Sequence, residues 1–178
     1  MNIEVTSTAD SGEGSLRDAV EKALNGDIVT FAIPSSDAGY DAESGKWTIL
    51  LTSGEIEVSC QNLKFQGGGK IILDSGKKSR IFNHCGEGSL TLEGMTFRNG
   101  KTRNGFIVTD GGVLQTNGSV IATGCAFLSN MSTGCGGAIW ALGSIAAVNC
   151  ELPPTSQPAA EARCTQKKAS LQRVANSL

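Results

Sequence analysis

Two kinds of hydrophobic pattern run along the chain. Residues 3–8 alternate apolar and polar side chains, and residues 28–31 are mostly apolar, so each run predicts a strand. Between them lies a stripe with the i, i+3, i+4, i+7 spacing of a helix of about two to three turns. Ser15 supplies an N-cap hydroxyl and residues 25–26 a C-cap. The apolar positions of this stripe are Leu16, Ala19, Val20, Ala23 and Leu24.

The second half of the chain repeats itself. Residues 111–120 match residues 136–145 at an offset of 25, and residues 88–97 match residues 118–127 at an offset of 30. Each unit holds short apolar runs separated by Gly, Asn or Ser, which suits strands bent at glycines. One unit cannot bury its own apolar face, whereas stacked units can. The repeat predicts an all-β fold, a single-stranded parallel β-helix that is right-handed by the usual crossover rule.

The offsets also predict which side chains stack on successive turns. We interpret these apolar ladders as core. In one of them Cys125 and Cys150 are neighbours, but their suitability for a disulfide depends on Cβ directions that the sequence does not give. The N-terminal helix is expected to cover the open apolar end of the solenoid. The predicted ladders are Leu90/Val120/Ile145, Leu92/Ala122/Ala147, Met95/Cys125/Cys150 and Phe97/Phe127.

The chain divides into three regions on this pattern. Residues 1–34 form the N-terminal cap and first turn, residues 35–150 the β-helix, and residues 151–178 a tail outside the repeat. All 23 glycines precede Cys150. We interpret the tail either as a linker with a short surface helix or as the product of a frameshift near residue 152. In the second case the native protein would continue with further turns.

Composition narrows the function classes. The 178 residues carry a formal net charge of −2 with no Lys/Arg run, so no nucleic-acid partner is expected. No apolar stretch reaches the length of a membrane-spanning helix, and the N-terminus lacks a signal-peptide pattern. The six cysteines are dispersed without a CxxC pair, and both free thiols and disulfides remain open. The sequence predicts no cofactor or metal site.

Two segments resemble known bacterial surface proteins. Residues 9–20 and 26–31 are similar to the SGxGSLRxAI…GDxIxF segment of bacterial surface β-helix proteins. Residues 127–130 and 136–139 resemble the paired FxxN and GGA[ILV] repeats of the chlamydial polymorphic outer membrane proteins. Residues 97–100 depart from FxxN. The motif residues are Ser15, Leu16, Arg17, Phe127, Asn130, Gly136 and Gly137.

The chlamydial proteins are autotransporter adhesins with an exported β-helix passenger and a C-terminal membrane barrel. The resemblance implies that this chain is a fragment of such a passenger, structural and adhesive rather than catalytic. Its expected location is the cell surface, the outer membrane or the secreted fraction, with membrane attachment only through a barrel missing from this chain. The expected partner is a host-cell surface protein or glycan.

Two loops are candidates for partner binding. The insertion at residues 99–110 carries Lys101, Arg103 and Phe106, and either packs as an extra strand or forms an adhesive protrusion. The polar segment 35–46, which ends just before Trp47, has the same ambiguity.

A pectate lyase-like or polygalacturonase-like enzyme and a non-functional truncated product are the alternatives. Hydrolysis needs two carboxylates facing one groove, and lyase chemistry needs a base and acidic Ca²⁺ ligands. Most Asp and Glu residues here are isolated, and His84 is the single histidine, interpreted as a surface or turn residue. The sequence therefore predicts no catalytic residue.

Overall fold

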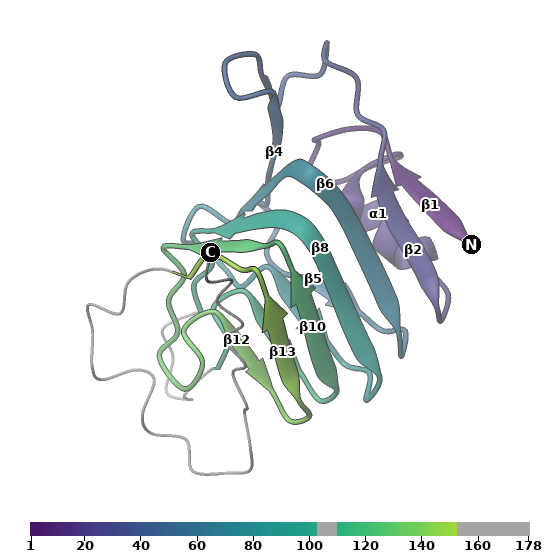
Figure 1. The fold of residues 1–178 in the computed structure, drawn as a ribbon. Helices are drawn as coiled ribbons and strands as arrows, with labels where there is room; N and C mark the ends of the chain where they lie inside the picture. The colour runs from purple at the N-terminus through teal and green to yellow at the C-terminus, as the bar shows by residue number, and fades with distance from the viewer. Residues whose placement is uncertain (103–109, 153–178) are drawn as a thin grey trace, which may run out of the picture.

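A computed structural model describes residues 1–102 and 110–152. The chain winds into a parallel β-solenoid of about five turns with one short helix, which confirms the predicted fold class. Figure 1 shows the strands of the larger sheet side by side along the solenoid. In spatial order these strands are β1 (Asn2–Val5), β2 (Asp27–Phe31), β6 (Leu63–Asp74), β8 (Ser89–Arg98), β10 (Ser119–Thr123) and β13 (Ile145–Val148).

The long strands β6 and β8 bend, and along one edge each pairs with a different strand before and after the bend. Before the bend, β6 pairs with β2 and β8 pairs with β10. Past the bend, β4 (Lys46–Leu50) runs parallel to β6, and β11 (Ala126–Leu128) runs parallel to β8. The smaller sheet forms the opposite wall and is also parallel. Its strands, in chain order, are β5 (Ile56–Val58), β7 (Phe82–His84), β9 (Leu114–Thr116) and β12 (Ile139–Ala141).

The strand register confirms the predicted ladders. Val120 pairs with Leu90 on one side and with Ile145 on the other, and Ala122 pairs with Leu92 and Ala147. Because side chains alternate between the two faces of a strand, these positions all point into the solenoid. The offsets of 30 and 25 therefore each mark one complete turn of the chain.

Phenylalanines form the centre of the core. Phe97 and Phe127 stack with ring centroids 5.2 Å apart and an interplanar angle of 15°. Phe82 of the smaller sheet lies between the walls, 5.0 Å from Phe65 and 6.3 Å from Phe97. All four rings are buried, so aromatic contacts join the two sheets across the core.

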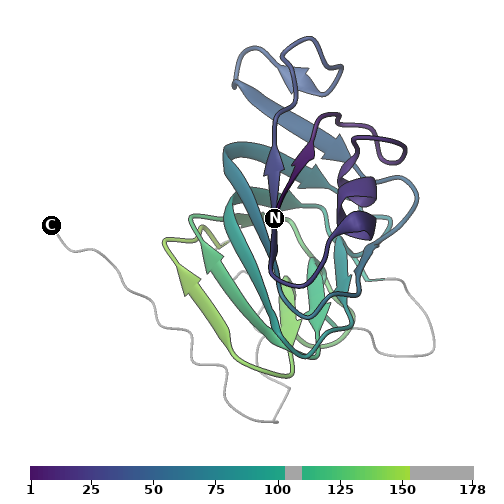
Figure 2. The same cartoon turned by 90° about the vertical axis from the view of Figure 1, so that its right-hand side faces the viewer.

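Helix α1 (Leu16–Lys22) occupies the N-terminal end of the solenoid. It contacts β1 and β5, the last strand of the smaller sheet at this end, and Figure 2 shows it beside the first strands. Leu16, Ala19 and Val20 are buried in the core, whereas Leu24 is 66% exposed, so the predicted apolar stripe is too long by that residue. This short helix cannot span a membrane, and the described part of the chain contains no helix that can.

Residues 32–46 leave the solenoid as a projecting hairpin. Within it β3 (Tyr40–Asp41) pairs antiparallel with the start of β4, opposing Tyr40 to Trp47. The hairpin stands clear of the other turns in both ribbon views (Figures 1 and 2). The polar segment before Trp47 is thus an ordered hairpin that projects from the first turn.

Candidate binding groove

A groove lies where the hairpin leaves the solenoid. Strand β2 pairs with β6 as far as Thr30 opposite Gln66, and pairing resumes with Trp47 opposite Ile71. Residues 67–70 therefore have no strand of the first turn beside them, which leaves a hollow of about 340 Å³, within the size range of small-ligand sites. Its lining residues are Thr30, Phe31, Ile33, Trp47, Gln66, Gly67, Gly68, Lys70 and Ile71.

Trp47 is the largest side chain in the groove, and its orientation is fixed. Its indole Nε1 donates a hydrogen bond of 3.0 Å to the Pro34 carbonyl oxygen. Its ring lies 4.8 Å from that of Tyr40, at an interplanar angle of 42°. The half-buried indole is thus held in place by a hydrogen bond and by an aromatic contact, which prepares it for binding at a small entropic cost.

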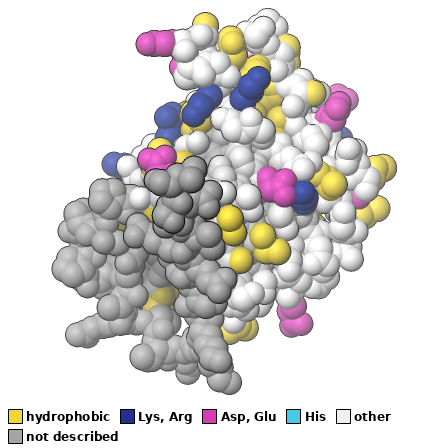
Figure 3. All heavy atoms as spheres, in the orientation of Figure 1, with side chains coloured by type: hydrophobic (Ala, Val, Ile, Leu, Met, Phe, Trp, Pro, Cys, Tyr) yellow, Lys and Arg dark blue, Asp and Glu magenta, His cyan; other side chains and the backbone are white. Residues whose placement is uncertain are grey.

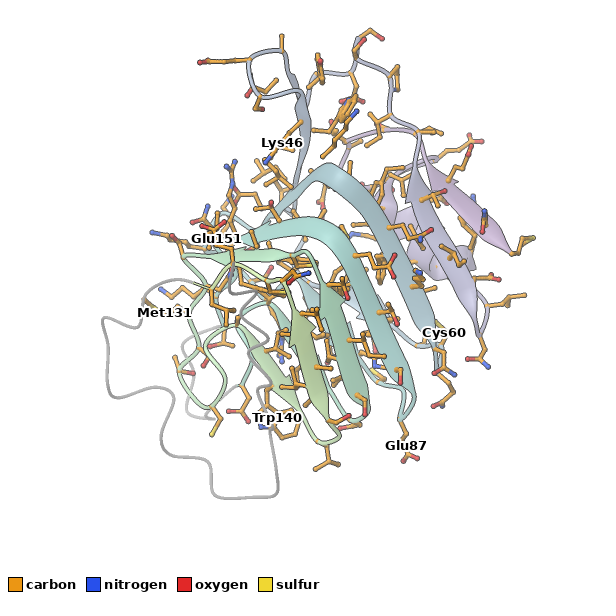
Figure 4. All side chains as sticks on the ribbon, in the orientation of Figure 1. Lys46, Cys60, Glu87, Met131, Trp140 and Glu151 are labelled. Carbon is orange, nitrogen blue, oxygen red and sulfur yellow. The ribbon has the colours of Figure 1, made fainter. Side chains whose placement is uncertain are left out.

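Polar groups surround the aromatic ring. Lys70 is exposed at the rim, and the Gln66 amide donates a hydrogen bond of 3.0 Å to Glu93, which also accepts one of 2.8 Å from Lys64. Figure 4 labels Lys46 near the base of the hairpin, and in Figure 3 Lys and Arg side chains gather in the same area. The groove therefore combines an aromatic surface, amide and hydroxyl groups and local positive charge.

The carboxylates of the first turns hold loops together. Burial opposes ionisation of Asp10, but hydrogen bonds from Ser53, Thr52 and Arg17 outweigh it and lower the pKa of this carboxyl to about 2. Asp37 shows the same balance: burial raises its pKa, while hydrogen bonds to the Thr8 hydroxyl and backbone lower it overall.

Asp74 is a third carboxylate of this kind. Burial raises its pKa, but hydrogen bonds from the Asn99 amide, the Gly76 backbone and Arg98 lower it overall. A carboxyl that acts as a general acid near neutral pH needs a raised pKa. The environments of these carboxylates shift their pKa values in the opposite direction and keep them as ionised acceptors.

His84 is a buried residue of β7, and its interpretation as a surface or turn residue is wrong. Its Nε2 lies 2.9 Å from the Cys60 carbonyl oxygen, and its Nδ1 lies 2.6 Å from the Thr116 hydroxyl oxygen. The carbonyl can only accept, so Nε2 carries a proton, and Nδ1 shares a hydrogen bond with the Thr116 hydroxyl. The imidazole links neighbouring turns of the solenoid.

The SLR motif fixes the helix to the first turn. The Ser15 hydroxyl accepts a hydrogen bond of 3.2 Å from the Asp18 amide as the N-cap, and Leu16 is buried. The Arg17 guanidinium donates to the Gly54 and Glu55 carbonyl oxygens at 2.8 and 2.9 Å. Because these carbonyls lie just before β5, Arg17 attaches the helix to the next part of the chain.

The FxxN motif joins consecutive turns. Phe127 supplies the stacked ring, and the Asn130 amide accepts from the Gly100 N–H at 2.8 Å and donates to the Phe97 carbonyl at 3.0 Å. Gly100 occupies the Asn position on the preceding turn, where a Cβ would lie 2.2 Å from the Gly112 carbonyl oxygen. This close approach explains why residues 97–100 depart from FxxN.

The two motif glycines differ in their requirements. Gly136 has φ of +63°, and a Cβ there would lie 2.2 Å from the Ile139 carbonyl oxygen. A Cβ on Gly137 would have no atom within 4 Å. The structure therefore requires glycine at the first position only.

The predicted partner-binding loop is described only at its edges. The Lys101 amide donates to the Ser79 carbonyl at 2.9 Å, and Lys101 forms a parallel bridge with Met131. Arg103 and Phe106 lie outside the described residues, as does the tail from residue 153 with its two interpretations. The Trp47 groove was missed by the sequence reasoning, although Tyr40 and Trp47 flanking a turn at Gly45 were a signal for a hairpin.

Comparisons with protein-family models, with curated proteins and with solved structures found no match. Within residues 1–102 and 110–152, no group of three or more His, Cys, Asp or Glu side chains is placed to hold a metal ion.

Proposed function

We propose that this chain is the adhesive, non-catalytic part of a cell-surface or secreted protein and binds an acidic glycan in the groove at Trp47. The observation that carries the proposal is the fixed indole of Trp47 beside Lys70 and Gln66 in a gap of the solenoid. The apolar face of a sugar ring stacks on an indole, and the hydroxyl groups bond to amides and hydroxyls at the rim.

The positive charge at the groove favours an acidic sugar. Lys70 at the rim and Lys46 near the hairpin base attract a carboxylate or sulfate group, and the projecting hairpin leaves the groove accessible from outside. The resemblance to adhesin passengers supports placement at the cell surface and a glycan of a host cell as the partner. The parallel solenoid is a rigid scaffold that suits this role.

The surroundings of Asp10, Asp37 and Asp74 do not suit any of these three carboxylates to act as the general acid of glycosidic cleavage. Cleavage by a lyase or hydrolase requires carboxylates that exchange protons or bind Ca²⁺ at one groove. Asp10, Asp37 and Asp74 have lowered pKa values because each accepts several hydrogen bonds, and Asp74 accepts two of them from Arg98 and Asn99 on the next turn.

Glycan binding by the purified chain tests the proposal. A panel of oligosaccharides in matched neutral and acidic forms is titrated calorimetrically against the wild type and against Lys70→Gln, Trp47→Ala and Lys78→Gln. We expect an acidic member to bind and Lys70→Gln to weaken it about tenfold, a loss of about 1.4 kcal/mol. Trp47→Ala should abolish binding, whereas Lys78→Gln, an exposed charge outside the groove, should leave it unchanged.

Each other outcome is decisive. Binding that survives both groove substitutions would place the site elsewhere, and cleavage of the bound glycan would make the protein an enzyme. If no glycan binds but a host-cell surface protein does, the ligand is a protein and not a glycan. Specific binding by the soluble chain would contradict a non-functional truncated product.

A further inference from the structure

Cys125 and Cys150 occupy equivalent places on adjacent turns. The Glu151 amide donates a hydrogen bond of 2.8 Å to the Cys125 carbonyl, and Glu151 forms a parallel bridge with Ala126. This register places Cys150 beside Cys125, as the offset of 25 predicts. Neighbouring parallel strands lie about 4.8 Å apart, and disulfides join residues whose Cα atoms are about 4.4–6.8 Å apart.

The two thiols also point in the same direction. The Sγ of Cys125 donates to the Leu92 carbonyl at 3.4 Å, and the Sγ of Cys150 donates to the Ala122 carbonyl, its counterpart one turn later, at 3.5 Å. Cys125 is buried, while Cys150 is half-buried and packs against the core. The two thiols are close enough for each to shift the pKa of the other, in opposite directions.

Two other described cysteines have environments that disfavour ionisation. Burial raises the pKa of Cys60. Cys85 is exposed, but partial loss of solvent around its thiol raises the pKa, and its hydrogen bond of 3.4 Å to Glu57 raises it further. Thiols react with disulfides as thiolates, so both cysteines react slowly.

We propose that Cys125 and Cys150 form a disulfide that locks the last described turn, β13, onto β10. Oxidation proceeds through a low-molecular-weight disulfide such as oxidised glutathione. The Cys150 thiolate attacks one sulfur of this reagent and releases one thiol. The Cys125 thiolate then attacks the Cys150 sulfur and releases the second thiol. Two protein thiols are oxidised and one external disulfide is reduced, and the protein's two protons end on the released thiols.

The order of attack follows from the surroundings of the two sulfur atoms. Cys150 is the more exposed of the pair, and a hydrogen bond from the Cys125 thiol stabilises its thiolate and lowers its pKa. That same interaction, together with burial, raises the pKa of Cys125. Cys150 therefore reacts with the external reagent, and Cys125 resolves the mixed disulfide from inside.

Peptide mapping of the full chain tests the proposal. The protein is equilibrated with oxidised glutathione, alkylated and digested with chymotrypsin and trypsin, which cleave after Phe127, Trp140 and Arg163 and so place Cys125, Cys135, Cys150 and Cys164 on different peptides. We expect a peptide pair linked through Cys125 and Cys150 that is lighter than the sum of its free forms by two hydrogen atoms. We also expect oxidation to raise the Tm by about 5–10 °C.

Matched variants separate this cross-link from general oxidation. Cys150→Ala should remove both the linked peptides and the rise in Tm, whereas Cys85→Ala should retain both. Linkage of Cys125 or Cys150 to a different cysteine, or their full alkylation after oxidation, would overturn the proposal. Mapping of the wild type gives this answer even where a variant folds poorly.

Discussion

The first and the last described turns of the solenoid are covered differently. At the N-terminal end, helix α1 lies against the core, and Leu16 and Val20 are only 1% and 5% exposed. In the last described turn, Leu142 is 67% and Val148 39% exposed. The chain therefore uses a different element, an amphipathic helix, to cover one end, while the last described turn presents strands of the same kind as those beneath it.

The difference shows what a turn needs in order to be buried. Val120, with a turn on either side, is fully buried, whereas its ladder partner Ile145 in the last described turn is only half-buried. Within residues 1–102 and 110–152, no strand pairs with the outer edges of β12 and β13. Because each turn of a solenoid gains stability mainly from its neighbours, local stability should fall from the middle turns toward β13.

The largest expected effect comes from weakening the contact between helix α1 and the core. Leu16→Ala deletes buried methyl groups between the helix and the core and should lower the free energy of unfolding by about 2–5 kcal/mol. The same substitution at the exposed Leu142 should change it by less than about 0.5 kcal/mol. Urea denaturation of the two variants measures both values. Equal losses would show that the two ends contribute alike.

A smaller effect is expected from the turn before β12. Gly136→Ala forces an alanine into a left-handed conformation against the Ile139 carbonyl and should cost about 1–3 kcal/mol. Gly137→Ala, which has open space around it, should be nearly neutral. Hydrogen exchange of the Gly136→Ala variant shows where the strain is released. Relative to the wild type, we expect exchange to accelerate more in β12 than in β7. Uniform acceleration in both strands would mean that the last turns are as firmly held as the middle ones.

The repeated part of the fold could be predicted from the sequence because stacking demands similar residues at equal spacing. The ladders through Leu90 and Leu92 follow directly from the offsets of 30 and 25. The earlier turns could not be aligned in this way. Phe65 pairs with Val29 across 36 residues, and the bulge within β6 shifts the register between Gln66 and Ile71.

The hydrophobic pattern could not predict where every single side chain lies, because this depends on the path of the surrounding chain. Leu24 continues the apolar stripe, but Ala23 already has an extended backbone with ψ of 135°, so the chain turns toward β2 before Leu24 can face the core. The groove at Trp47 was beyond sequence reasoning for a similar reason. It exists because the first turn leaves the sheet at the hairpin, and only the register of β2 and β4 along β6 reveals that gap.

The smallest expected effect concerns the attachment of the N-terminal cap at low pH. Asp10 joins Arg17 of the helix to Thr52 and Ser53 beyond β4. Its pKa in the folded protein is about 2, below its ordinary value of 3.8, so the unfolded chain binds this proton more tightly. The stabilisation is complete above about pH 4 and is lost as the pH falls toward 2. It amounts to about 1 kcal/mol, since the carboxylate is partly screened by solvent.

Asp10→Asn should therefore be less stable than the wild type at pH 5, and the difference should shrink as the pH falls to 2.5. Urea denaturation across this range measures it. Asp41→Asn is the matched control, because the side-chain carboxylate of Asp41 accepts its hydrogen bonds from Glu43 and Ser44, both within the hairpin. It should leave hydrogen exchange in α1 and β1 unchanged, whereas Asp10→Asn should accelerate it. A constant difference between Asp10→Asn and the wild type at every pH would show that the charge of the carboxylate does not hold helix α1 to the first turn.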